Sequence, residues 1–230
     1  MNALILSAGY GKRLKPITLT KPKCLVRIKG KPIISIWIEN LIKINAKKIY
    51  VNTHYQHKQV ESYLKKKRLN TKLKILYEPT LLGTAGTLIK NINYFLNSNL
   101  LLAHCDNYFL ESLSKIISFH NNRPKKYLMT MVAFKTRKPE TCGIIKEKNN
   151  SIIDYFEKKK GRNGNLANGA TYVISPEMLK IIVDNFSDAK DFSNDIIPFI
   201  KDYIYVYKTK KFFQDIGTIR NLNQVNTFLK

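Results

Sequence analysis

Apolar positions along the first half of the chain follow a strand and helix rhythm. A short apolar run over residues 2–7 predicts a strand buried on both faces. Apolar side chains then recur at helical spacing from Ile33 to Ile42, directly after Pro32, a residue suited to a first helical turn. Further strands are expected at 48–52, 73–77 and 100–105, and further helices at 58–66, 84–96 and 111–120. Such alternation predicts an α/β protein with a mainly parallel sheet covered on both faces.

The rhythm changes after Arg123. Strand-like segments are expected at 128–134, 143–147, 152–156 and 170–174, and helices near Pro176 and Thr218. The sheet is therefore expected to become mixed in this half. No linker, repeat or low-complexity tract interrupts the chain, so residues 1–230 are expected to form a single domain.

Charge is the unusual feature of the composition. Lys and Arg total 40 against 16 Asp and Glu, a formal net charge of +24. Such a charge suggests a nucleic-acid-binding protein, but 33 of the basic residues are Lys and only 7 are Arg, the residue that best forks onto bases and phosphates. Three widely spaced cysteines give no disulfide framework, and no apolar run is long enough to cross a membrane. A cytoplasmic protein that binds neither nucleic acid nor membrane is expected.

A glycine turn follows the first predicted strand. Gly9 and Gly11 would let the backbone approach a phosphate closely, and Lys12, Arg13 and Lys23 surround the turn with positive charge. The spacing matches neither GxGxxG nor a Walker GK[ST] loop, which disfavours a nicotinamide-binding Rossmann domain and a P-loop ATPase. A small polyanion is the expected ligand.

The segment LSAGYGKRLKPITLTKPKCL, residues 6–25, resembles the signature of the sugar-1-phosphate nucleotidylyltransferases, with Lys12 and Cys24 as departures from the usual pattern. Later motifs extend the resemblance over the whole chain, which is similar to short members such as the mannose and heptose 1-phosphate guanylyltransferases that lack a C-terminal β-helix. The resemblance implies a three-layer Rossmann-like nucleotidyltransferase fold. It also implies catalytic roles for Arg13 and Lys23 and nucleotide contacts from Leu6, Ala8, Gly9 and Gly11.

A second stretch, YEPTLLGTAG from Tyr77, resembles the family's base-binding segment and implies nucleotide contacts from Glu78, Gly83 and Ala85. Glu78 stands where thymidylyl-transferring relatives carry Gln. A carboxylate offers two acceptors, which suit the N1 and N2 donors of guanine and suit thymine or uracil poorly. GTP is therefore the favoured nucleotide.

Two aspartates are the expected metal ligands. Asp106 follows the predicted strand 100–105, and carboxylates at the carboxyl end of a parallel strand suit Mg²⁺ that bridges nucleotide phosphates. Cys105-Asp106-Asn107 resembles the family's [GA]-D-N, and Asp215 lies in a segment resembling [WF]-x-D-[IT]-G-T. The two side chains could share one ion.

Three later motifs resemble the family's contacts to the sugar phosphate. Cys142-Gly143-Ile144-Ile145 implies an amide contact from Gly143, Tyr155-Phe156-Glu157-Lys158 implies roles for Glu157 and Lys158, and the segment from Asn168 to Tyr172 implies a contact from Asn168. Each motif alone is weak evidence for a sugar-phosphate contact. The support comes from their order along the chain after the first motif.

The sequence thus predicts transfer of a nucleotidyl group from a nucleoside triphosphate, GTP in preference, to a sugar 1-phosphate, with release of pyrophosphate. Cytidylyl, uridylyl or thymidylyl transfer on the same fold stays open, as does a non-sugar acceptor such as phosphocholine. A basic nucleic-acid-binding protein is the remote alternative. The sequence names neither the sugar nor the oligomeric state, and a homo-oligomer stays open.

Overall fold

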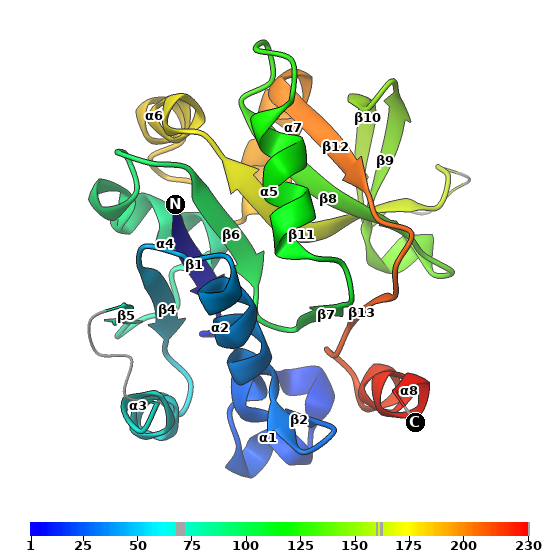
Figure 1. Ribbon diagram of the computed structural model, residues 1–230. Coiled ribbons are helices and arrows are strands. Elements are labelled where there is room, and N and C mark those ends of the chain that lie inside the picture. Colours follow the sequence, from blue (N-terminus) through cyan, green and yellow to red (C-terminus); the bar gives the residue numbers. More distant parts are fainter. Residues whose placement is uncertain (68–71, 160, 162, 230) are drawn as a thin grey trace. The chain divides into compact units, whose positions relative to one another are not determined.

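Parallel strands dominate the first part of the chain (Figure 1). β1 (Asn2–Leu6) pairs in parallel with β4 (Ile49–Thr53), which pairs in parallel with β5 (Leu73–Tyr77). β4 is buried along its whole length, as expected of a strand covered on both faces. Helices α2 (Ile33–Lys43) and α3 (His57–Lys65) supply the crossovers that parallel neighbours require.

The computed structural model describes residues 1–67, 72–159, 161 and 163–229. The chain divides into two units, each assembled from separate stretches of sequence. Unit 1 contains residues 1–81, 103–110 and 213–230, and unit 2 contains residues 82–102 and 111–212. The expectation of one domain over 1–230 stays a prediction.

Short elements complete unit 1. α1 (Ile17–Thr20) follows the glycine turn, and β2 (Arg27–Ile28) pairs with β3 (Lys31–Pro32). β7 (Asn107–Phe109) pairs in antiparallel fashion with β13 (Phe213–Asp215), and α8 (Ile219–Phe228) follows β13. The pairing of β7 with β13 joins two segments that lie far apart in the sequence. No local sequence pattern predicts this pairing.

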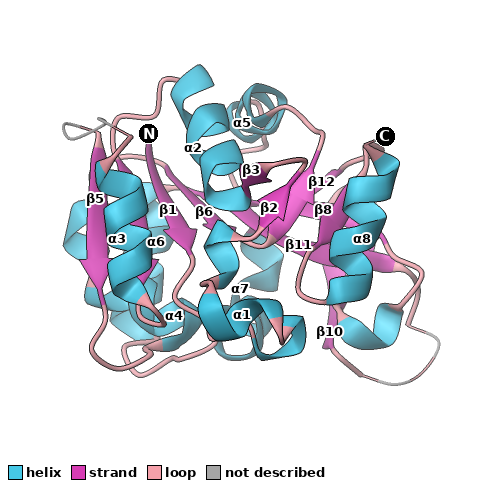
Figure 2. Cartoon of the chain, turned by 90° about the horizontal axis from the view of Figure 1, so that it is seen from below, coloured by secondary structure: helices cyan, strands magenta, loops and turns pink. Residues whose placement is uncertain are grey.

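Unit 2 carries a mixed sheet. Its strands pair in the order β6-β11-β8-β12-β10-β9, with an additional pairing of β11 and β9. β8 lies antiparallel to β11 and parallel to β12, and Figure 2 shows these three strands together. The strands are β6 (Leu100–His104), β8 (Met129–Lys135), β9 (Gly143–Lys148), β10 (Ser151–Glu157), β11 (Leu166–Ile174) and β12 (Ile204–Lys208). The last two residues of β6 belong to unit 1.

The helices of unit 2 begin and end at recognisable signals. Ser175 caps α6 (Pro176–Asn185) by accepting a hydrogen bond from the Met178 amide, with proline in the first turn. α4 (Gly83–Lys90) begins at a glycine with φ of 83°, where an added Cβ would lie 2.3 Å from the Lys190 carbonyl oxygen. The other helices are α5 (Leu113–Asn121), α7 (Ile197–Ile200) and a π-helix over Phe192–Ile196.

The predicted α/β class with a mixed sheet is confirmed. The expected helix over 84–96 is too long, because α4 ends at Lys90 and a separate 3₁₀ turn follows at Ile92–Tyr94. The sequence reading missed β12 and β13, and the short strands β2, β3 and β7. Among the described residues, no helix is long and apolar enough to span a bilayer.

Candidate functional site

The glycine turn follows β1 as predicted. Leu6 ends β1, Ala8 is buried, and the Gly11 carbonyl accepts a hydrogen bond from the Thr18 hydroxyl at 2.9 Å. A Cβ placed on Gly9 would meet no described protein atom within 4 Å. The Gly9 backbone is therefore open to a ligand.

Lys23 and Asp106 form an ion pair within unit 1. Their side chains are 18% and 21% exposed, so the pair is largely withdrawn from water. Burial alone would raise the pKa of Asp106, but the Lys23 ammonium, His104 and the hydrogen bond from Lys23 outweigh it and lower that pKa to about 2. Asp106 is thus an anion at neutral pH, held beside the Lys23 ammonium.

The pairing of β7 with β13 brings Asp215 to the same part of unit 1. Asp215 lies opposite Asn107 in register, and the Ile216 amide donates to the Asp106 carbonyl oxygen at 2.8 Å. Asp215 Oδ1 accepts from the Gly217 amide at 2.9 Å, and Oδ2 accepts from Asn221 Nδ2 at 3.0 Å. The carboxylate is therefore held in a fixed orientation.

The Arg13 guanidinium lies beside Gly217, next to Asp215. A Cβ placed on Gly217 would lie 2.9 Å from Arg13 Nη2 and 2.6 Å from Asp215 Oδ1, so the guanidinium and the carboxylate flank one point. The fold therefore gathers the four residues expected to act on phosphate and metal, Arg13, Lys23, Asp106 and Asp215, within one unit.

Two carboxylates suit a hard divalent cation. In the part of the chain that the structure describes, no group of three or more His, Cys, Asp or Glu side chains forms a complete metal cage. Mg²⁺ is commonly held by only one or two carboxylates, with substrate phosphates and waters as its other ligands. Asp106 and Asp215 fit such a partial site.

Glu78 is buried, with 2% of its surface exposed. The Glu78 amide donates to the Thr53 carbonyl at 2.8 Å, and the Glu78 carbonyl oxygen lies 2.8 Å from His54 Nδ1. Asn52 Nδ2 donates to Glu78 Oε1 at 2.9 Å, and Asn52 is held in turn by the Ser7 amide at 2.6 Å. Both the backbone and the carboxylate of Glu78 are thus fixed by neighbours in unit 1.

Gly83 and Ala85 belong to unit 2, where the Ala85 amide donates to the Lys190 carbonyl at 2.9 Å. Thr84 Oγ1 accepts from the Phe192 amide at 2.7 Å. The turn at the start of α4 is therefore fixed by the segment that enters the π-helix.

The predicted sugar-phosphate residues lie on β9, β10 and β11 of unit 2, except Lys158, which directly follows β10. Gly143 lies opposite Glu157 in register, and a Cβ on Gly143 would lie 2.3 Å from Tyr155 Oη and 2.4 Å from Glu157 Oε2. Lys158 Nζ lies 3.0 Å from Glu157 Oε1, and Asn168 Nδ2 lies 3.4 Å from Tyr155 Oη. A side chain at position 143 would therefore displace the Tyr155 hydroxyl and the Glu157 carboxylate.

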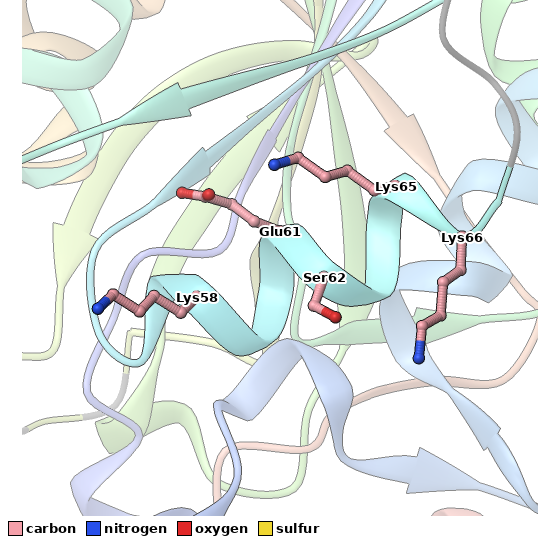
Figure 3. Close-up of a pocket in the computed structure, with 5 residues that line it drawn as sticks. All are labelled: Lys58, Glu61, Ser62, Lys65 and Lys66. Atoms are coloured by element: carbon pink, nitrogen blue, oxygen red, sulfur yellow. The ribbon is translucent and has the colours of Figure 1, made fainter.

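The two buried cysteines and a surface pocket on α3 contain none of the predicted site residues. Burial raises the pKa of the Cys24 thiol to about 12 and raises that of Cys105 as well, so neither is a ready nucleophile. Figure 3 shows a surface pocket on α3, lined by Lys58, Glu61, Ser62, Lys65 and Lys66. None of these five is a predicted site residue.

Sequence reasoning missed three residues that hold predicted ones in place: Ser7, Asn52 and Tyr155. Asn52 lies one residue before the end of the buried strand β4, and a polar side chain there is the signal that could have singled it out. Tyr155 lies two positions before Glu157 on a strand, so the two side chains had to share a face.

A sequence model described as nucleotidyl transferase matches residues 2–230 of the chain. The mannose-1-phosphate guanylyltransferase catalytic subunit beta of Drosophila melanogaster is 31% identical over 228 residues, covering 94% of this chain and 59% of the relative. The corresponding Dictyostelium discoideum subunit is 29% identical over 231 residues, covering 94% of this chain and 61% of the relative. The chain spans about three fifths of the length of these curated relatives.

The fold also has solved counterparts. The crystal structure of HddC from Yersinia pseudotuberculosis, complexed with GMP-PN, superposes with a TM-score of 0.81 at 24% identity and covers 100% of this chain and 99% of that one. The Rossmann-like nucleotidyltransferase fold expected from the sequence is confirmed.

Proposed function

The chain belongs to the nucleotidyl transferase family, and from this premise we propose that it transfers a guanylyl group from GTP to a sugar 1-phosphate. The products are a nucleotide-activated sugar and pyrophosphate. One observation carries the proposal: Arg13, Lys23, Asp106 and Asp215, the residues expected to meet phosphates and metal, lie together in unit 1.

The reaction requires little covalent work from the protein. A phosphate oxygen of the sugar 1-phosphate attacks the α-phosphorus of the nucleotide in line, and the bond to pyrophosphate breaks. Positioning and neutralisation of charge supply most of the rate enhancement in such transfers. Lys23 would neutralise the α-phosphate, Arg13 the departing pyrophosphate and Lys158 the attacking phosphate.

Nucleotidyl transfer generally uses a divalent metal ion, and we propose Mg²⁺ here. Asp106 and Asp215 would hold the ion, which when bound offsets the negative charge on the nucleotide phosphates. Because the pKa of Asp106 is lowered to about 2, this ligand is ionised throughout the physiological range. The hydrogen bonds from Gly217 and Asn221 would keep the second ligand, Asp215, in place.

Guanine is the favoured base on two grounds. A carboxylate at Glu78 suits the paired N1 and N2 donors of guanine, and the hydrogen bond from Asn52 to Oε1 fixes its orientation. Curated relatives named mannose-1-phosphate guanylyltransferases match nearly the whole chain. The same relatives make mannose 1-phosphate the first acceptor to test, with the Gly143, Glu157 and Asn168 cluster as the sugar-binding residues. A cytoplasmic location would supply both substrates.

The test is a matrix of substrates. The purified protein with Mg²⁺ is incubated with ATP, GTP, CTP, UTP or dTTP and with mannose 1-phosphate, glucose 1-phosphate, other sugar 1-phosphates or phosphocholine. Pyrophosphate release is measured for each pair. Product in the GTP row with a sugar acceptor is expected. Activity confined to dTTP or UTP would overturn the role given to Glu78, and activity only with phosphocholine would overturn the sugar acceptor.

A further inference from the structure

Glu157 is held by a tyrosine on its own strand. Tyr155 and Glu157 lie two positions apart on β10, so their side chains share one face of the sheet. The Tyr155 hydroxyl donates a short hydrogen bond to Glu157 Oε2. A hydrogen bond from a neutral donor to a carboxylate is stronger than one between neutral groups, so this contact fixes the carboxylate.

The tyrosine hydroxyl is itself supported from β11. Asn168 Oδ1 accepts from the Ala170 amide at 2.9 Å, which turns the Asn168 amide nitrogen toward two tyrosine hydroxyls. That nitrogen donates to Tyr172 Oη at 2.8 Å and to Tyr155 Oη at 3.4 Å. The Tyr155 hydroxyl therefore accepts a hydrogen bond from Asn168 and donates one to Glu157.

The other oxygen of Glu157 has a looser partner. Lys158 Nζ lies 3.0 Å from Glu157 Oε1, but the Lys158 side chain is 62% exposed while that of Glu157 is 13% exposed. An exposed lysine can leave such a pair at little cost, because solvent screens the attraction. Burial raises the pKa of Tyr155, so its hydroxyl stays protonated and remains the constant donor.

We propose that Tyr155 is a positioning residue for the sugar 1-phosphate, whose hydroxyl orients the Glu157 carboxylate to accept hydrogen bonds from the sugar. The inference rests on the proposed function, because it assigns Glu157 to the sugar. Tyr155 acts through Glu157 and touches no reacting atom. Its loss should weaken sugar binding and leave the nucleotide and the chemical step unaffected.

The first experiment compares Tyr155→Phe with Tyr205→Phe. Both remove one hydroxyl from unit 2, but Tyr205 Oη pairs with Asn150 at 3.2 Å, apart from the sugar cluster. Steady-state rates are measured with GTP, Mg²⁺ and the sugar 1-phosphate that the wild type uses fastest in the substrate matrix. Tyr155→Phe should raise the KM for the sugar phosphate about tenfold and leave kcat and the KM for GTP within about twofold. Tyr205→Phe should match the wild type.

The second experiment adds Glu157→Gln in a double-mutant cycle. If Tyr155 acts through Glu157, Tyr155→Phe in the Glu157→Gln background should change the KM for the sugar phosphate by less than about twofold. A full tenfold effect in both backgrounds, an equal rise in both KM values, or no effect in the wild-type background would overturn the inference. A wild type that uses no sugar 1-phosphate overturns the proposed acceptor and this inference with it, a result distinct from failure of the variants alone.

Discussion

At the scale of single residues, Lys23 is the side chain on which the proposed chemistry depends most. It pairs with Asp106 where both side chains are about four fifths buried, so their attraction is stronger than that of an exposed pair. Lys31 and Glu39 form an exposed pair at 2.7 Å in the same unit, with side chains 50% and 44% exposed. The two lysines therefore offer a matched comparison.

Lys23→Ala should lower kcat about 100- to 1,000-fold, the usual cost of removing one charged or donor group aimed at the transition state. Lys31→Ala should leave kcat unchanged. Pyrophosphate release gives the rates, and circular dichroism checks that both variants are folded. Near-normal turnover in folded Lys23→Ala would remove Lys23 from the catalytic role.

Gly9 offers a test of where the phosphates bind. Because a Cβ at Gly9 would meet no described protein atom within 4 Å, Gly9→Ala should fold with a Tm close to that of the wild type. If the backbone of the turn approaches a phosphate, the new methyl group occupies that space, and the KM for GTP should rise about tenfold or more. Unchanged kinetics would show that the phosphates bind elsewhere.

At the scale of elements, His120 joins α5 to β8 in unit 2. It is fully buried, and its Nδ1 lies 2.9 Å from Thr130 Oγ1. Burial, reinforced by the nearby Arg123 charge, lowers the pKa of His120 to about 3. The folded chain therefore keeps this imidazole neutral where the unfolded chain takes up a proton.

The sign of the pH effect follows from that difference. Below pH 6.5 the unfolded state binds a proton that the folded state refuses until about pH 3, so stability falls as pH falls across this window. The slope from this group approaches about 1.4 kcal/mol per pH unit. Urea unfolding at pH 7, 6, 5 and 4 should show a steeper loss of stability in the wild type than in His120→Gln, and parallel losses would contradict the assignment.

Much of the secondary structure could be predicted from periodicity. The strand over 73–77 was placed at its exact bounds, and the apolar face from Ile33 to Ile42 became α2. β12 was missed although Ile204 and Val206 are buried and alternate with less buried neighbours, a period of two that could have revealed it. The helix expected at 84–96 was overextended because apolar residues continue past Asn91 into the 3₁₀ turn.

The candidate site was also predictable only in part from the sequence. Motif spacing identified Lys23, Asp106 and Asp215, but the ion pair of Lys23 with Asp106 and the backbone bond from Ile216 to Asp106 depend on long-range pairing. No local pattern encodes contacts between residues that lie far apart in the sequence. The roles of individual side chains in binding remain predictions.

At the scale of the whole molecule, the net charge of +24 creates a positive field that attracts anionic substrates. Salt shortens the reach of such a field from about 30 Å at 0.01 M to about 8 Å at 0.15 M. Raising ionic strength over this range should therefore lower kcat/KM for GTP by about tenfold, with a smaller change in kcat. If kcat/KM for GTP does not change with salt, the net charge does not steer the substrate and serves only solubility.

The interleaving of the two units along the chain has a consequence for biosynthesis. Residues 1–81 of unit 1 are made before residues 111–212 of unit 2, and β13 and α8 of unit 1 are made after them. A growing polypeptide that has reached residue 212 already contains Arg13, Lys23 and Asp106 but still lacks Asp215. On the ribosome, Asp215 can join the cluster of Arg13, Lys23 and Asp106 only after β13 has been translated, so shorter products lack one of the two proposed metal ligands.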